Sequence, residues 1–378
     1  MLIVATSPNA IVRNGMPDTG LVNALVEAKK NGNPVGLFSN HAAPAWYAQH
    51  FNGSGVQYLH EYGRQNGKCL QANAAKFKLQ PHDVIVLATT STDLHMGKNA
   101  GAVVLAGGWS DDAQVKALGV AVDDAEEFAR LLSLCASWPG GWWFSGATDR
   151  YKVLALADLS TMYKGDAQQQ FGQMLTAVVK GGGAQLKALV AVVARSLLAQ
   201  GFGTMDELLW GSYPSSASAN NDTDVLSDFT HRLRTTVSRV QFAKRGQPLF
   251  IRHTPSVKRS TAAQGNRTDP ANQVETLHLN PFYENRLAGK NVVVVDDCTT
   301  YGLSFGVAEA FLRAAGAKSV TGVALGKFGA QLRSYQIQII SNPFEPVVAG
   351  GYSGGEVGFF PGTTDYAAQQ ALLTLLQS

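Results

Sequence analysis

The sequence predicts an α/β protein with two domains, and three observations support this prediction. The chain has 378 residues, which is enough for two domains of roughly 150 residues each. Short β-branched runs without polar alternation recur between amphipathic helical stretches, which is typical of a parallel sheet covered by helices on both faces. A segment rich in Trp and Gly, Trp138–Phe144, separates two series of such elements. We therefore expect a first domain at 1–135, a linker at 136–150, a second domain at 151–340 and a C-terminal extension at 341–378.

The first domain alternates strands and helices in the order that a parallel sheet requires. Its expected strands are Leu2–Ala5, Pro34–Phe38, Val84–Ala88 and Val103–Ala106, and its expected helices are Leu21–Asn31, Asp93–Ala100 and Ala125–Leu132.

The second domain has five expected strands, at Lys152–Ala157, Glu207–Tyr213, Pro248–Arg252, Val292–Val295 and, as the last strand, Ser319–Leu325. Helical stretches lie on both sides of the glycines 181–183, and further helices are expected at Val225–Val237, at Phe305–Ala315 with Ser304 as N-cap, and at the C-terminus.

Composition narrows the function classes. A net charge of +3 is too small to indicate a nucleic-acid surface. Three widely spaced cysteines, Cys69, Cys135 and Cys298, fit neither a disulfide framework nor a metal site and favour a reduced cytoplasmic setting. The N-terminus lacks the basic region of a signal peptide, and the longest apolar run, Ala188–Ala199, contains Arg195 and is too short to span a bilayer. We expect no membrane anchor.

The most informative segment is Asn291–Ser304, which joins a buried strand to a polar loop and a helix start. Asp296 and Asp297 are expected at the carboxyl end of the strand, where open α/β sheets bind ligands. Hydroxyls, loop N–H groups and a helix N-terminus follow, and this combination attracts phosphate. The alternative is an acidic pair that only caps a strand and a helix.

This segment resembles the PRPP-binding motif of type I phosphoribosyltransferases (PRPP is 5-phosphoribosyl 1-pyrophosphate). The resemblance implies that Asp296 and Asp297 hold the ribose and contact Mg²⁺ indirectly, through PRPP. It also implies a loop around the 5′-phosphate, formed by Thr299, Thr300, Tyr301, Gly302, Leu303 and Ser304. Tyr301 and Leu303 are bulkier than the usual Thr and Ala.

The chain also resembles the ComF-like branch of that family over roughly residues 155–330. Tyr163–Asp166, Phe171–Lys180, the glycines 181–183 and the apolar helix after them carry this resemblance. It implies a pyrophosphate loop after the strand at 207–213, lined by the backbone N–H groups of Ser215, Ser216 and Ala217. The alternative is a flexible linker.

A polar loop at 252–277 is long enough to be functional. In this family such a loop closes over PRPP, excludes water and supplies cations to the leaving pyrophosphate. The resemblance makes Lys258, Arg259 and Arg267 catalytic candidates and Arg252 a pyrophosphate ligand. The alternative is a solvated run of charges.

The first domain resembles haloacid dehalogenase-like (HAD) phosphatases in its fourth motif, Val84–Ala102, and this implies a Rossmann-like fold. Ser39, Lys68 and Asp93 occupy positions that match motif residues of that family. Its nucleophilic aspartate has no counterpart, because the first strand reads Ile3–Pro8 without a carboxylate, and Thr89 replaces the first acid of the fourth motif. We therefore expect a domain without phosphatase activity.

Together these features predict a phosphoribosyltransferase that uses Mg²⁺-PRPP to transfer ribose 5-phosphate to a nucleobase or related heterocycle, or that catalyses the reverse reaction. Two alternatives are a PRPP- or nucleotide-sensing regulator and a nucleic-acid-processing accessory protein with a vestigial site. The expected partners are PRPP, a small base and a second copy of the chain. Phe328 is expected either to stack on the base or to belong to the core.

Overall fold

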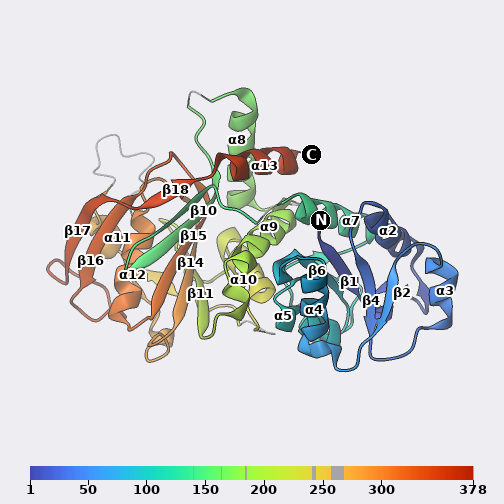
Figure 1. Cartoon of the computed structure of the whole chain (residues 1–378). Helices are drawn as coiled ribbons and strands as arrows, with labels where there is room; N and C mark the ends of the chain where they lie inside the picture. The colour runs from blue at the N-terminus through green and yellow to red at the C-terminus, as the bar shows by residue number, and fades with distance from the viewer. Residues whose placement is uncertain (139, 163, 184, 241–243, 257–267, 378) are drawn as a thin grey trace. The chain divides into compact units, whose positions relative to one another are not determined.

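Two six-stranded sheets organise the chain in the computed structural model, which describes residues 1–138, 140–162, 164–183, 185–240, 244–256 and 268–377. The first compact unit comprises Met1–Gly140, Ala184–Thr204 and Arg232–Ala243. The second comprises Gly141–Gly183, Met205–His231 and Lys244–Ser378. The predicted α/β class is confirmed (Figure 1).

The sheet of the first unit is parallel throughout, with strand order β5-β4-β1-β6-β7-β8. Its strands are β1 (Ile3–Thr6), β4 (Val35–Ser39), β5 (Gln57–His60), β6 (Val84–Ala88), β7 (Val103–Gly107) and β8 (Ala121–Val122). A short hairpin, β2 (Val12–Arg13) and β3 (Met16–Pro17), follows β1. The strand order reverses between β1 and β6, so their carboxyl ends flank the crevice in which such sheets bind ligands.

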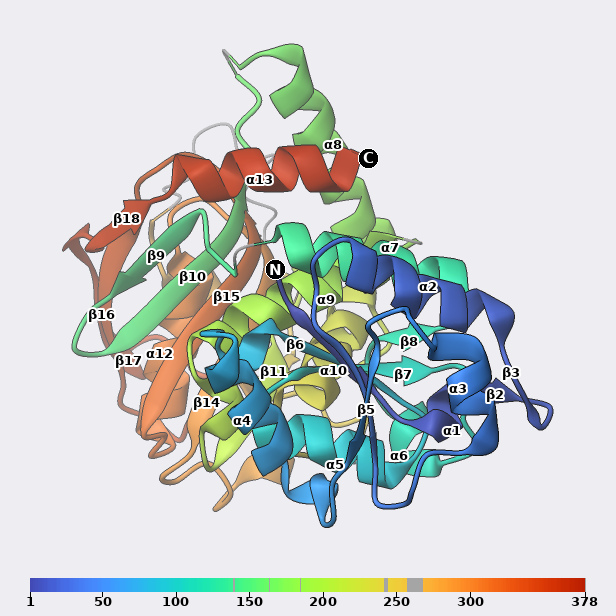
Figure 2. The ribbon, with the colours of Figure 1, turned by 45° about the vertical axis from the view of Figure 1, so that its right-hand side comes forward.

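Helices cover both faces of this sheet (Figure 2). One face carries α4 (Lys68–Lys76), α5 (Ser91–Ala100) and α6 (Ala113–Lys116), and the other carries α2 (Thr19–Lys30), α7 (Ala125–Ser137) and α9 (Gln185–Ala199). Two short helices, α1 (Pro8–Ile11) and α3 (Ala45–Phe51), and three 3-10 turns, Arg64–Asn66, Pro81–Asp83 and Phe202–Thr204, complete the unit.

Helix α9 is buried, as predicted, although it carries a cation. The Arg195 guanidinium donates to the carbonyls of Cys135 and Trp138 and to Asp83 Oδ1, the last at 2.6 Å. These acceptors offset the cost of removing the charge from water. As a result α9 belongs to the first unit, although it lies inside the range of the ComF-like resemblance.

The sheet of the second unit is mixed, with strand order β11-β14-β15-β10-β9-β18. Four strands pair in parallel, β10 (Tyr151–Asp158), β11 (Leu208–Ser212), β14 (Asn291–Thr299) and β15 (Ser319–Lys327). Beside β10, β9 (Phe144–Ala147) pairs antiparallel with it, and β18 (Gly362–Thr364) pairs antiparallel with β9. The expectation of a parallel sheet is therefore confirmed for four strands of this unit, whereas the pairs β10–β9 and β9–β18 are antiparallel. Residues 144–147, expected in a linker, form β9.

Helix α12 (Leu303–Ala314) covers one face of this sheet, and α8 (Asp166–Gly181) and α13 (Tyr366–Gln377) cover the other (Figures 1 and 2). Helix α10 (Val225–Val237) passes from the second unit into the first at residue 232. The smaller elements are the hairpin of β12 (Phe250–Arg252) and β13 (Leu277–Leu279), the hairpin of β16 (Arg333–Ile339) and β17 (Tyr352–Phe359), α11 (Ala271–Val274) and the 3-10 turn Pro281–Tyr283.

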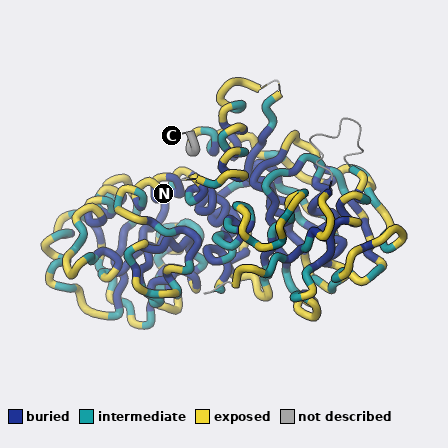
Figure 3. Tube along the Cα trace, turned by 180° about the vertical axis from the view of Figure 1, so that it is seen from behind, coloured by how far each residue is buried: buried dark blue, intermediate teal, exposed yellow. Residues whose placement is uncertain are grey.

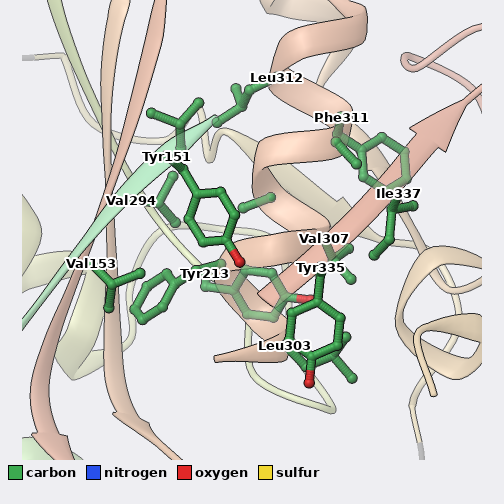
Figure 4. Packing of buried hydrophobic residues seen from close by; sticks show 14 of the residues in the cluster. Tyr151, Val153, Tyr213, Val294, Leu303, Val307, Phe311, Leu312, Tyr335 and Ile337 are labelled. Carbon is green, nitrogen blue, oxygen red and sulfur yellow. The ribbon is translucent and has the colours of Figure 1, made fainter. Parts of the chain in front are cut away.

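The core of the second unit lies between the sheet and α12. Val294 packs from the sheet, Leu303 and Val307 pack from α12, and Tyr335 and Ile337 cover the helix from β16 (Figure 4). Buried stretches of the chain alternate with exposed ones (Figure 3). The central strands β1, β6, β14 and β15 consist mostly of buried residues, whereas β17 is largely exposed.

Three expectations about the second unit need correction. Strand β14 does not end at Val295 but continues through Asp296 and Asp297 to Thr299, because β15 stays paired with it that far. Helix α12 begins at Leu303 with Gly302 as N-cap, so Ser304 lies inside its first turn.

The strand at Ser319 is also not the last strand, because it extends to Lys327 and β16, β17 and β18 follow. The glycines of β17 hide its strand pattern. Among the described residues, no single helix is both long enough and apolar enough to cross a membrane.

Candidate functional site

The carboxyl ends of four neighbouring parallel strands form one edge of the sheet in the second unit. Beyond β11 lies the segment 213–217, which we call the serine loop, and the end of β14 leads into residues 299–304, which we call the phosphate loop. The two loops start side by side, because the Tyr213 N–H donates to the Val295 carbonyl at 2.8 Å. Lys327 ends β15, and Asp158 ends β10.

The acidic pair is divided between the two faces of β14, because consecutive residues of a strand point in opposite directions. The Asp296 carboxylate is buried on the α12 side, where Oδ2 accepts from Ser304 Oγ at 2.6 Å and Oδ1 accepts from the Asp297 N–H at 2.9 Å. Asp297 is half-buried, and its Oδ1 accepts from the Cys298 N–H at 2.6 Å. Asp296 therefore ties the strand end to the helix start, and Asp297 is the more accessible carboxylate.

The Cys298 thiol stays protonated in this setting. Burial raises its pKa strongly, and the negative charges of Asp297 and Asp296 raise it further. Lys180, in the last turn of α8, is close enough for its charge to oppose this rise. A thiol without thiolate character is a poor nucleophile, so Cys298 is not a catalytic candidate.

Backbone N–H groups of the segment 328–333 donate to carbonyl groups of the phosphate loop. The Thr299 carbonyl accepts from the Phe328 N–H at 2.9 Å, and the Tyr301 carbonyl accepts from the Arg333 N–H at 3.0 Å. A trans peptide points its N–H away from its C=O, so the N–H of Thr300 faces away from the segment 328–333. Within the described part of the chain, the N–H groups of Thr300, Tyr301, Leu303 and Ser304 have no hydrogen-bond acceptor.

Two side chains of the phosphate loop serve the loop itself. Thr299 Oγ1 accepts from the Gly302 N–H at 2.9 Å, and Leu303 is buried in the core, so its side chain does not line the loop. Gly302 has a φ of 77°, and a Cβ there would lie 3.2 Å from Leu332 Cδ2. The turn into α12 therefore needs glycine at this position.

The serine loop is organised by Arg252, which is 4% exposed. Its Nε donates to the Ser215 carbonyl at 2.7 Å and Nη2 to the Pro214 carbonyl at 3.3 Å, while the Ser256 N–H donates to the Ser216 carbonyl at 2.9 Å. These contacts turn the carbonyls of residues 214–216 inward. The N–H groups of residues 215–217 belong to the same three trans peptides, so they point outward.

The predicted pyrophosphate-binding N–H groups of Ser215, Ser216 and Ala217 thus point away from Arg252 and have no acceptor among the described residues. The structure places Arg252 behind the loop, where its Nη1 donates to Thr276 Oγ1 at 2.7 Å and its Nη2 to Gln273 Oε1 at 3.0 Å. Its contacts identify it as a residue that positions the loop.

Lys258, Arg259 and Arg267, the cations predicted to close over the ligand, lie outside the described residues, and so does Tyr163. His253 lies shortly before the undescribed residues 257–267, and its ring stacks on that of His278 with the centroids 5.7 Å apart. Burial lowers the pKa of His253, and the charges of His278 and Arg252 lower it further.

Sequence reasoning missed two groups at this edge. The first is Lys327, which is fully buried. The sequence predicts a possible role in base binding only for its neighbour Phe328, which is 38% exposed. Gln369 of α13 pairs with the backbone of Asp158: its Oε1 accepts the Asp158 N–H at 2.7 Å, and its Nε2 donates to the Asp158 carbonyl at 3.1 Å. A glutamine in an amphipathic terminal helix gives no signal of such a role.

The first unit brings one of its three predicted residues into a buried polar cluster. Asp93 Oδ2 accepts from Ser7 Oγ at 3.0 Å and from the N–H groups of Thr89 and Thr90, each at 3.1 Å. Arg64 Nη2 lies 2.7 Å from Asp93 Oδ1, an ion pair whose angle is too oblique for a hydrogen bond. The carboxylate is therefore neutralised inside the unit at the end of β6.

The other two residues lie apart from this cluster. Ser39 is buried at the end of β4, and its Oγ accepts from the His41 N–H at 3.0 Å. Lys68 is exposed at the start of α4, and no hydrogen bond or ion pair joins it to Asp93 or Ser39 in the described chain.

No group of three or more His, Cys, Asp or Glu side chains within the described ranges is arranged to hold a metal ion. Comparison with known proteins found no matching family model, no matching curated protein and no matching solved structure.

Proposed function

We propose that the second unit is a PRPP-dependent phosphoribosyltransferase. The observation that carries this proposal is the pair of neighbouring loops at the ends of β11 and β14, each with backbone N–H groups that have no acceptor within the described residues. Two such anion sites, with the accessible carboxylate of Asp297 at the start of one, suit a ligand that carries phosphate groups at both ends of a sugar.

Each part of PRPP then has a counterpart in the chain. The phosphate loop holds the 5′-phosphate through the N–H groups of Thr300, Tyr301, Leu303 and Ser304, and the serine loop holds the pyrophosphate through residues 215–217. Asp297 accepts from the ribose hydroxyls, while Asp296 keeps Ser304 and the helix start in place.

The reaction is displacement at the anomeric carbon by a nitrogen atom of the acceptor base. The bond from that carbon to the pyrophosphate oxygen breaks, the new bond to nitrogen forms, and the pyrophosphate leaves with the bonding electrons. Mg²⁺, which enters chelated to PRPP, supplies positive charge to the leaving group. The half-buried Asp297 fits an indirect contact with this ion. Lys258, Arg259 and Arg267 are proposed to add charge when the ligand is bound.

Calorimetry with Mg²⁺-PRPP tests whether the protein binds PRPP and whether the acidic pair is needed for binding. The wild-type chain is expected to bind, and the variant with both Asp296→Asn and Asp297→Asn is expected to lose binding. Equal affinities would contradict the assignment. Incubation of wild-type protein with Mg²⁺-PRPP and a panel of bases then separates an enzyme from a sensor, because only an enzyme releases pyrophosphate in step with base consumption.

For the first unit we propose a supporting or ligand-binding role without phosphatase chemistry. No carboxylate follows β1, where the chain has Ser7. Asp93, the one acid that matches a motif residue of the HAD family, is paired with Arg64 and accepts from Ser7. Phosphatase activity that is lost in Asp93→Asn would overturn this proposal. We further propose a reduced cytoplasmic setting.

A further inference from the structure

Lys327 is a buried cation whose hydrogen bonds to other described residues all go to backbone carbonyl groups. The residue is 0% exposed. Its Nζ lies 2.5 Å from the Gly329 carbonyl oxygen, 2.8 Å from that of Gln331, 3.2 Å from that of Phe328 and 3.4 Å from that of Thr300. The first three belong to the loop after β15, and the fourth belongs to the phosphate loop.

This contact completes a pattern along the phosphate loop. The carbonyls of Thr299 and Tyr301 accept from backbone N–H groups of Phe328 and Arg333. The carbonyl between them, that of Thr300, lies 3.4 Å from Lys327 Nζ and shares the three ammonium protons with the carbonyls of Phe328, Gly329 and Gln331. Consecutive carbonyls of the loop are thus held by the segment 327–333, and the lysine acts where no backbone donor is available.

The consequence concerns the peptide between Thr300 and Tyr301. Because its C=O is directed at Lys327, its N–H points the opposite way, with the other N–H groups that have no acceptor in the described chain. Lys327 itself cannot reach a ligand, since its side chain is enclosed. It acts on the site through the backbone.

Charge in the surroundings supports this arrangement. Asp158 pairs with Lys327 across β10 and β15, and its negative charge favours the ammonium form. Burial works in the other direction and lowers the pKa of Lys327 to about 8. Carbonyl dipoles from two loops compensate part of the lost hydration.

We propose that Lys327 is a positioning residue of the phosphate loop, which fixes the Thr300–Tyr301 peptide so that its N–H faces the phosphate of the ligand. This inference rests on the proposed function for its ligand, but the geometry of the loop can be tested without any ligand.

The first test is hydrogen exchange of the unliganded protein, read from peptides that cover residues 299–304. Lys327→Met keeps the apolar stem and removes the donor, so we expect the hydrogen-bonded amide of this loop, that of Gly302, which donates to Thr299 Oγ1, to exchange about tenfold faster or more. Lys318→Ala, which removes an exposed lysine at the opposite end of β15, is the matched control and is expected to exchange like wild type. Unchanged exchange at 299–304 in Lys327→Met would overturn the inference.

The second test is chemical rescue. Lys327→Ala leaves space for a small alkylammonium ion, which can donate to the same carbonyls. Ethylammonium is expected to slow exchange at 299–304 again, whereas tetramethylammonium, which has no N–H, is expected not to do so. Equal effects of the two ions would contradict the proposed role.

Mg²⁺-PRPP calorimetry on the same variants links the loop to the ligand. We expect Lys327→Met to bind about tenfold more weakly than wild type. If wild type does not bind PRPP but the exchange results hold, the proposed function fails and the positioning role stands. If wild type and Lys327→Met bind PRPP equally, the positioning role fails and the proposed function stands.

Discussion

Asp296 and Asp297 are adjacent in sequence but have different surroundings. Asp296 is buried against α12 and bound to Ser304, whereas Asp297 is half-buried on the opposite face of β14. Substitution of either residue by Asn removes a charge with little change in shape. The two variants therefore separate a role in stability from a role in binding.

We expect Asp296→Asn to lower the free energy of unfolding by about 1–3 kcal/mol, because it weakens a buried charge-assisted hydrogen bond. Asp297→Asn should change that free energy by less than about 0.5 kcal/mol and weaken Mg²⁺-PRPP binding about tenfold or more. Urea titration and calorimetry measure the two effects. Asp206→Asn, an exposed aspartate before β11, is the control, and the prediction is wrong if Asp297→Asn binds PRPP like this control.

Gly302 has a backbone conformation that glycine adopts most easily, with a φ of 77° and Leu332 close to the absent Cβ. Gly302→Ala is expected to cost about 1–2 kcal/mol in backbone strain. It should also weaken PRPP binding, because the turn carries the N–H groups of Leu303 and Ser304.

Gly289 is a matched control, because its φ is 74° and a Cβ there would meet nothing within 4 Å. Gly289→Ala should show a similar loss in urea titrations and unchanged PRPP affinity. Equal affinity losses in the two variants would show that the effect is general destabilisation.

At the scale of elements, the serine loop depends on one side chain. Arg252 holds carbonyls of this loop with a planar guanidinium, and a lysine cannot reproduce several donors in a fixed plane. We expect Arg252→Lys to weaken binding of Mg²⁺-pyrophosphate about tenfold and to leave binding of ribose 5-phosphate within about twofold of wild type. Calorimetry with each ligand measures this.

Arg286→Lys is the control for that substitution, since Arg286 is an exposed arginine that packs on the Phe282 ring. If Arg252→Lys weakens both ligands equally, Arg252 supports the unit as a whole and has no selective effect on the serine loop.

The C-terminus of α10 is closed by a lysine from another helix. Lys98 of α5 is buried, and its Nζ donates to the carbonyls of Thr235, Thr236 and Ser238, the last two at 2.7 Å. Burial lowers the pKa of Lys98 from 10.5 to about 7. Between these two values the unfolded chain binds a proton that the folded chain has lost, so the free energy of unfolding rises with pH.

The expected rise is at most about 1.4 kcal/mol per pH unit between about pH 7 and pH 9. Lys98→Met lacks this titration, so the stability difference between wild type and this variant should change with pH in urea titrations. A difference that is independent of pH would contradict the lowered pKa of Lys98.

At the scale of the whole molecule, the sequence predicts where helices and strands lie better than it predicts which elements pack or pair with one another. The α/β class, the bounds of β6 and the bounds of α10 follow from apolar patterning and are confirmed. Strands β16 to β18 are missed, because they lie at edges or contain glycines and lack a β-branched run.

In the candidate site, too, local features are predicted from the sequence and contacts between distant residues are not. A local motif predicts the acidic pair and both loops, whose ligand roles stay predictions. The contacts of Arg252, Lys327 and Arg64 depend on carbonyls and carboxylates brought near by the fold, so no local pattern indicates them. Helix α9 is apolar and buried, but its packing partners cannot be read from its own sequence.

The division into units makes a prediction about fragments. A fragment that ends at Gly140 contains the whole parallel sheet of the first unit but lacks α9 and residues 232–243. It would expose the surface that α9 covers and leave Lys98 without the carbonyls of α10. We expect this fragment to have native-like far-UV circular dichroism but weak near-UV signal and strong binding of a hydrophobic dye. A cooperative unfolding transition and the absence of dye binding would contradict this.

The path of the chain between units also bears on synthesis at the ribosome. The chain leaves one unit for the other after residues 140, 183, 204, 231 and 243. The first unit cannot be completed until residue 243 has emerged, and by then 141–183 and 205–231 of the second unit are outside the ribosome without β14 or β15. Domains usually fold one after another as they emerge, but here the two folding periods overlap. Nascent chains stalled between residues 140 and 243 should therefore be the ones that chaperones bind most strongly.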